Sequence, residues 1–154
     1  MYTDLWSFAL ALYSRPGVET ACLDLQAAGA DVCLLLCGAW LAERGVAPTA
    51  ERVKQLQQMA GPWQTDVVQP LRQLRQQWRE AALQDAGLNA LRKQVKTLEL
   101  EAERQLLMRL EGLSSEWPAG QAEHVSDWLQ RLAPAGQSLP HGALQVLRAA
   151  VARA

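Results

Sequence analysis

Residues 30 to 42 read ADVCLLLCGAWLA and form the most apolar run of the chain. The uncharged part, Val32 to Ala42, is eleven residues long, which is about half the length that a helix needs to span a bilayer. Its apolar residues follow one another instead of alternating with polar ones, so the run is not typical of a half-buried strand. We expect a helix that is apolar nearly all round and lies at the centre of a compact helical unit.

Glycine and proline cut the rest of the chain into helical segments. Nothing alternates with a period of two over a useful length, so we expect an all-α protein without a sheet. The expected helices cover residues 4–14, 18–28, 31–44, 50–60, 66–86, 88–113, 122–132 and 141–152. Asp31 and Thr49 are the expected N-caps of the third and fourth segments, and the sequence GPW at 61–63 is expected to end the fourth.

Two long amphipathic segments occupy the middle of the chain. The apolar stripe of the first consists of Val67, Leu71, Leu74, Trp78 and Ala82, and that of the second of Leu91, Val95, Leu98, Ala102, Leu106, Leu110 and Leu113. They predict a long antiparallel αα-hairpin over 63–113, joined near Gly87, with arms of about 30–40 Å. We expect a single domain, 1–154, with a compact core over 4–60 and a pair of shorter C-terminal helices over 120–153 packed on it. The exposed half of such a hairpin needs a partner, such as a second copy of the chain.

Several short patterns occur in a fixed order along the first two thirds of the chain. The patterns are Trp-x-Phe at 6–8, Tyr13, Pro-Gly-Val at 16–18, Leu-x-Leu-Gln at 23–26, Asp-Val at 31–32, Leu-Leu at 35–36 and Trp-Leu at 40–41, then Pro-Trp at 62–63 and Pro-Leu-Arg-x-Leu-Arg at 70–75. In this combination, residues 5–110 resemble a family of small bacterial proteins of unknown function. The resemblance implies a soluble, all-helical bacterial protein, and it supplies no reaction, ligand or site.

Cys33 and Cys37 lie four residues apart, which places both thiols on one face of the expected helix. With Cys22 as a third candidate ligand, the spacing does not fit the paired cysteines of a structural zinc site, nor the C-x-x-C of a redox dithiol. Free cysteines among leucines are most often buried as small apolar side chains. We interpret them as core residues, with redox sensing and metal binding as the alternatives. The residue after Asp-Val is often polar in the resembled family, which argues against a family-wide thiol role at Cys33.

Arg72, Arg75 and Arg79 project within about 60° of one another on the first long segment. Guanidinium groups on one rigid face suit carboxylates or phosphates, so we predict an interaction surface formed by this row and by Trp63, which flanks a proline. The alternative is a structural role in which the row pairs with acids of the N-terminal unit, such as Asp24, Asp31 or Glu43. The acids that follow on the second segment, Glu99, Glu101 and Glu103, are typical of a solvated mixed-charge face.

Composition and charge limit the function. The chain of 154 residues is 49% hydrophobic and 20% charged, with a net charge of −1, which is typical of a globular domain. Residues 51–110 carry ten Lys and Arg against seven Asp and Glu, whereas residues 1–50 carry two against five. The N-terminus lacks the basic region of a secretory signal, and three cysteines do not form a closed disulfide framework, so we expect a cytoplasmic protein.

Catalytic motifs are missing from the sequence: it contains no G-x-S-x-G, no H-E-x-x-H and no phosphate-binding glycine loop. We therefore expect a non-enzymatic protein-interaction or regulatory module, with a protein partner or self-association, no membrane span, and neither cofactor nor metal. The alternative is a site between helices for an apolar or anionic small molecule. A third interpretation is weak nucleic-acid binding through residues 52–109, although nucleic-acid surfaces usually show a larger basic excess.

Overall fold

Helix α3 (Val32–Glu43) is the centre of the computed structural model, which describes residues 4–120, 125–134 and 139–152. Every residue of this helix from Val32 to Ala42 is buried. The Asp31 carboxylate caps the helix and accepts a hydrogen bond from the backbone N–H of Leu34 at 3.3 Å, as the sequence predicts. A helix without a polar face must be covered on every side, and helices from both halves of the chain pack against it.

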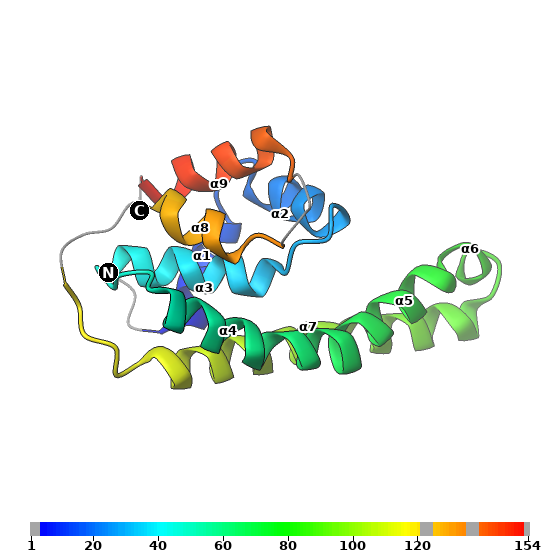
Figure 1. The fold of residues 1–154 in the computed structure, drawn as a ribbon. Helices are drawn as coiled ribbons and strands as arrows, with labels where there is room; N and C mark the ends of the chain where they lie inside the picture. The colour runs from blue at the N-terminus through cyan, green and yellow to red at the C-terminus, as the bar shows by residue number, and fades with distance from the viewer. Residues whose placement is uncertain (1–3, 121–124, 135–138, 153–154) are drawn as a thin grey trace.

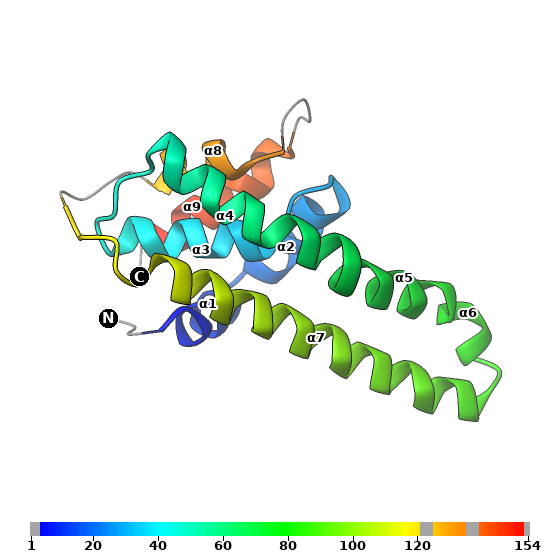
Figure 2. The same cartoon turned by 60° about the horizontal axis from the view of Figure 1, so that its bottom comes forward.

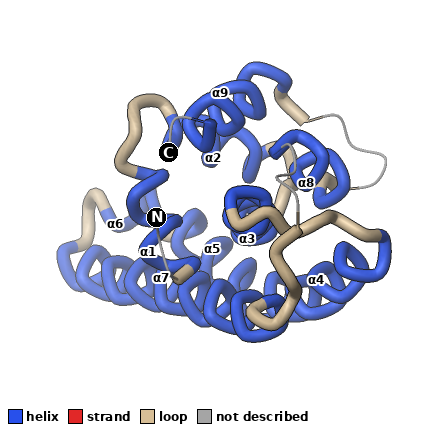
Figure 3. The backbone as a smooth tube through the Cα atoms, turned by 90° about the vertical axis from the view of Figure 1, so that its left-hand side faces the viewer, coloured by secondary structure: helices blue, strands red, loops and turns tan. Residues whose placement is uncertain are grey.

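Four short helices complete the body around α3: α1 (Leu5–Tyr13), α2 (Val18–Ala27), α8 (Val125–Leu132) and α9 (His141–Ala152). The C-terminal pair covers core helices, because α8 packs on α3 and α9 packs on α2 (Figures 1 and 3). Trp128 of α8 is fully buried, and its indole N–H donates to the carbonyl of Val46 at 2.8 Å. The sequence analysis gave this tryptophan no role. The expected start of α8 at residue 122 lies outside the described residues.

Two long antiparallel arms extend from this body. The first arm consists of α4 (Ala50–Trp63), a π-helical turn η1 (Gln64–Val68), α5 (Gln69–Gln77) and α6 (Arg79–Ala82), and the second arm is α7 (Ala86–Ser114). Helix α7 contacts every segment of the first arm, and the outer half of the pair projects beyond the body (Figure 2). The described ranges contain helices and no strand, which confirms the all-α class. None of the described helices combines the length and the hydropathy that crossing a bilayer requires.

The first arm begins earlier than predicted, because the chain stays helical past GPW at 61–63. The helix continues through Pro62 and passes into the widened turn η1, where the backbone N–H of Gln69 donates to the carbonyl of Gln64, five residues back. A proline lacks the N–H of the regular ladder, and Pro62 and Pro70 lie on either side of η1. The irregular backbone is confined to one π turn between the two prolines. The chain is therefore helical without interruption from the start of α4 to the end of α5.

The join between the arms also differs from the prediction at Gly87. Asp85 caps α7, and its carboxylate accepts a hydrogen bond from the backbone N–H of Leu88 at 3.1 Å. Gly87 therefore lies in the first turn of α7, and the chain reverses over residues 83–85. An aspartate at the N-cap favours the start of a helix more strongly than a glycine disfavours its continuation. This explains why α7 begins before Gly87.

Gly38 sets the distance between α3 and α8. A Cβ added at this position would lie 2.7 Å from Cδ1 of Leu132 and 3.2 Å from Cβ of Trp128. We predict that Gly38→Ala lowers the free energy of unfolding by about 1–3 kcal/mol through overpacking, as measured by urea denaturation. Gly61→Ala is the control, since nothing lies within 4 Å of its added Cβ; it should raise stability by up to about 1 kcal/mol. Equal effects of the two substitutions would contradict the close approach of α3 and α8.

Candidate functional site

Arg72 and Arg75 bind two glutamates across the two arms. Arg72 donates from Nε to Oε2 of Glu99 at 3.1 Å and from Nη2 to Oε1 of Glu103 at 3.3 Å. Arg75 donates from Nε to Oε1 of Glu99 at 2.5 Å and from Nη2 to Oε2 at 3.3 Å. We call these four residues the ion-pair cluster. The arginines thus pair within the chain, but with acids of α7 instead of acids of the N-terminal unit.

The two carboxylates of the cluster are compensated unequally. Burial opposes the ionisation of Glu99, yet the hydrogen bonds from Arg75 and Arg72 outweigh it and hold the pKa of Glu99 below its ordinary value. Glu103 accepts from Arg72 alone within the cluster, and burial raises the pKa of Glu103 above its ordinary value. Glu99 is therefore a stable anion, whereas Glu103 is a carboxylate with less opposing charge than its burial demands.

The other two predicted surface residues are not members of the ion-pair cluster. Trp63 is half-buried, and its indole N–H donates to the carbonyl of Ala102 at 2.9 Å. The Arg109 guanidinium lies 3.9 Å from the centroid of the same ring, so Trp63 joins the first arm to α7. Arg79 is exposed at the start of α6. Arg72, Arg75, Arg79 and Trp63 thus do not form one exposed face.

Other arginines of residues 52–109 are stacked on aromatic rings. Arg52 lies 5.4 Å from the centroid of Trp117, and Arg104 lies 5.0 Å from that of Trp6. Such cation–π contacts hold the guanidinium groups against the protein surface. Nucleic-acid binding through residues 52–109 would need these same cations, and Arg52 and Arg104 are already in contact with tryptophan rings.

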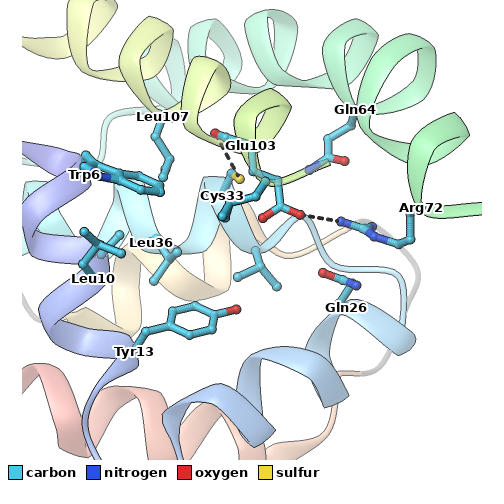
Figure 4. A pocket seen from close by; sticks show the side chains of 13 residues that line it. Trp6, Leu10, Tyr13, Gln26, Cys33, Leu36, Gln64, Arg72, Glu103 and Leu107 are labelled. Carbon is cyan, nitrogen blue, oxygen red and sulfur yellow. Dashed lines mark hydrogen bonds and ion pairs between the residues drawn. The ribbon is translucent and has the colours of Figure 1, made fainter. Parts of the chain in front are cut away.

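A pocket of about 180 Å³ opens beside the ion-pair cluster, between α1, α2, α3 and α7 (Figure 4). Its apolar wall consists of Trp6, Ala9, Leu10, Val32, Leu36, Leu100 and Leu107, and its polar residues are Tyr13, Gln26, Cys33, Gln64, Arg72 and Glu103. Leu10 and Leu100 are 53% and 52% exposed, so the pocket reaches the surface between α1 and α7. The body supplies most of the apolar wall, and the two arms supply three of the polar groups.

Gln64 connects the pocket to the N-terminus of α3. Its Nε2 donates to Oδ1 of Asp31 at 2.8 Å, and the same Oδ1 accepts the backbone N–H of Leu34, so this oxygen acts as an acceptor and fixes the orientation of the amide. Gln64 is 8% exposed, and its Oε1 finds no hydrogen-bond partner among the described residues. A buried acceptor without a partner is unusual in folded proteins.

The three cysteines are free and buried, which confirms their interpretation as core residues. Burial raises the pKa of Cys22 to about 11 and also raises the pKa values of Cys33 and Cys37. The protonated Cys33 thiol lies 3.9 Å from the carbonyl of Glu103 and forms part of the pocket wall. No group of three or more His, Cys, Asp or Glu side chains within the described ranges is arranged to hold a metal ion.

Sequence analysis missed Gln64 and placed Glu99 and Glu103 on a solvated face. One signal for the cluster is present in the sequence. Arg72 and Arg75 are spaced i, i+3 and Glu99 and Glu103 are spaced i, i+4, and each spacing puts a pair on one helix face. Two such pairs of opposite charge on adjacent antiparallel helices predict contact between the faces. Gln64 carries no comparable signal, because a single glutamine is common on helix surfaces.

The fold and the pocket together define an all-α protein with a surface pocket at the base of a projecting pair of helices. The chain belongs to the family described as "Protein of unknown function (DUF2390)", which matches residues 4–110. This match confirms the resemblance to a family of unknown function, and it covers every residue that lines the pocket. Comparison with curated proteins and comparison with solved structures each returned no match.

Glu99 is expected to stabilise the fold through its two arginines. We predict that Glu99→Gln lowers the free energy of unfolding at neutral pH by about 2–3 kcal/mol, less than for a fully buried pair because both arginines reach solvent. Folding lowers the pKa of Glu99, so its contribution is present above the unfolded pKa and is lost as the pH falls through the folded pKa. Denaturation at neutral pH and at about pH 3 should show that the difference between parent and variant shrinks in acid.

Glu103→Gln is the matched control for this prediction. Folding raises the pKa of Glu103, so the contribution of this carboxyl to stability decreases as the pH rises through its folded pKa. The neutral amide should therefore change stability at neutral pH by no more than about 1 kcal/mol. A larger loss for Glu103→Gln than for Glu99→Gln would contradict the unequal compensation of the two carboxylates.

Proposed function

We propose that the protein is a non-enzymatic binding module that holds a small, mainly apolar molecule in the pocket between α1, α2, α3 and α7. The observation that carries the proposal is the combination of an apolar wall and a few converging polar groups in one cavity that reaches the surface. Small-molecule sites typically have this composition, whereas well-packed interiors contain few voids larger than a water molecule.

The volume of the pocket limits the size of the ligand. An engineered apolar cavity of about 150 Å³ binds benzene, and the pocket is slightly larger, at about 180 Å³. Trp6 and Tyr13 bring aromatic rings to the pocket, with Leu36 between them and Leu107 beside Trp6 (Figure 4). These dimensions favour a single ring, or an alkyl group of similar size, with a short polar substituent.

The position of the pocket supports a regulatory role for binding. Arg72 of the first arm and Glu103 of the second both line it, together with residues of α1 and α3. A ligand in the pocket therefore contacts the body and both arms at once. Since a ligand that binds only the folded arrangement stabilises it, occupancy would strengthen the attachment of the arms to the body.

Self-association through the outer half of the arms is a second candidate function. Leu91 and Leu98 lie two turns apart on one face of α7, and they are 51% and 55% exposed. In a two-fold antiparallel pair of α7 helices, Leu91 of each copy faces Leu98 of the other, which makes the row self-complementary. We place the expected interaction surface on this row because Arg72 and Arg75 are held in the ion-pair cluster.

Benzyl alcohol is the probe for the pocket. We predict that it raises the melting temperature and shifts the methyl resonances of Leu36 and Leu107 in a titration to about 10 mM, since a ligand of this size is expected to bind with a Kd of about 1 mM. Ala9→Leu fills the pocket and should abolish the shifts, whereas Ala81→Leu, on the exposed face of α6, should retain them. A parent protein without shifts, or shifts that persist in a folded Ala9→Leu variant, would rule out this site.

Sedimentation equilibrium tests the second candidate. We predict a monomer–dimer equilibrium for the parent protein that Leu98→Lys shifts to monomer, because a lysine pair would then be buried against Leu91. Met108→Lys changes another exposed apolar residue of α7 (54% exposed) and is the control that should leave the dimer intact. A parent protein that remains monomeric at every concentration would exclude self-association.

A further inference from the structure

The polar end of the pocket contains one carboxylate, that of Glu103, and one guanidinium, that of Arg72. Gln64 lines the same end, but its Nε2 is bound to Asp31 and its Oε1 is too enclosed to meet a ligand. Glu103 presents a carboxylate at the same end of the pocket (Figure 4). Arg72 is the one cation among the residues that line the pocket, and its Nε and Nη2 are already bound to Glu99 and Glu103. A ligand that donates hydrogen bonds fits this inventory better than one that accepts them.

The charges around Glu103 also favour a ligand that donates hydrogen bonds. Glu99 receives three of the four hydrogen bonds that Arg72 and Arg75 donate to the cluster, and Glu103 receives one, at 3.3 Å. A cation placed beside Glu103 would supply the opposing charge that its burial lacks. An anion at the same place would meet a carboxylate and would compete with Glu99 and Glu103 for Arg72. The pocket therefore disfavours the anionic ligand that the sequence left open.

Aromatic groups complete the surroundings of the polar end. The hydroxyl of Tyr13 points from α1 into the pocket, toward the side on which Glu103 and Gln26 lie (Figure 4). The electron-rich faces of tryptophan and tyrosine rings attract cations, and Trp6 already has the Arg104 guanidinium 5.0 Å from its centroid. An ammonium group donates hydrogen bonds and accepts none, which matches the Glu103 carboxylate and the phenol oxygen of Tyr13 as acceptors.

We propose that the ligand of the pocket is a small primary amine whose ammonium group binds Glu103 and whose apolar body lies against Trp6, Leu36 and Leu107. This inference rests on the proposed binding function and adds the chemical class of the ligand. No covalent step is involved, and binding exchanges the hydration of the ammonium for hydrogen bonds to the protein.

Three probes of similar size separate the head groups: benzylamine, which is cationic at neutral pH, benzyl alcohol, which is a neutral donor, and benzoate, which is an anion. We expect calorimetric or NMR titration at constant ionic strength to give benzylamine a Kd about tenfold lower than that of benzyl alcohol, which corresponds to one charge-assisted hydrogen bond. Benzoate should bind more weakly than either. Equal binding of benzylamine and benzyl alcohol, or a preference for benzoate, overturns the amine proposal and leaves the pocket as a binding site.

Two matched variants test whether Glu103 causes the preference for benzylamine. Glu103→Gln should remove the advantage of benzylamine over benzyl alcohol, because the amide keeps the shape of the carboxyl and loses its charge. Glu101→Gln makes the same charge change on the exposed face of α7 and should leave the advantage intact. If both variants weaken benzylamine equally, the preference arises from the net charge of the protein and the assignment to Glu103 is wrong. If none of the three probes binds the parent protein, the proposed function itself fails.

Discussion

The need to cover α3 on every side governs the arrangement of the other helices. Its residues 32–42 offer no polar face to water, so α1, α2, α8 and the inner parts of α4 and α7 all pack around it. The 12 residues of α3 extend over about 18 Å, whereas the 29 residues of α7 extend over about 43 Å. The arms therefore continue beyond the helix that they cover, and their outer half must be held together by contacts between the arms themselves.

The ion-pair cluster lies at this change from body to arms. On the body side, α7 buries apolar residues such as Leu106 and Leu110 against α3, and farther out the contacts include the pairs of Arg72 and Arg75 with Glu99 and Glu103. The pocket is situated at the same place and has the same mixed character. Its apolar wall belongs largely to α1 and α3, and its charged groups belong to the arms. The selectivity that we propose for an amphipathic ligand thus follows from where the pocket lies.

The sequence predicts most of the body and little of the site. The bounds of α1, α2, α3 and α9 follow from local signals, such as the glycines after α2 and α3 and the N-cap at Asp31, and the structure places these helices within one residue of the expected ends. The helical continuation past Trp63 was not predicted, because the effect of Pro62 depends on the turn that follows it. Glu103 is half-buried only through the register between the two arms, which no local pattern specifies. The pocket is a small volume that side chains from separate helices leave unfilled. No single stretch of sequence determines whether such a volume remains.

The π turn changes the directions in which the side chains of the first arm point. A regular helix turns by about 100° per residue, and a turn closed by a bond to the fifth residue back contains one residue more than a regular turn. Every side chain after Val68 is therefore rotated by about 100° from the direction that an uninterrupted α4 would give it. This offset directs Arg72 and Arg75 toward α7. Loss of a single residue from η1 would keep both arms helical and point the two guanidinium groups away from their glutamates, so the length of this turn, as much as the identity of the charges, encodes the contact between the arms.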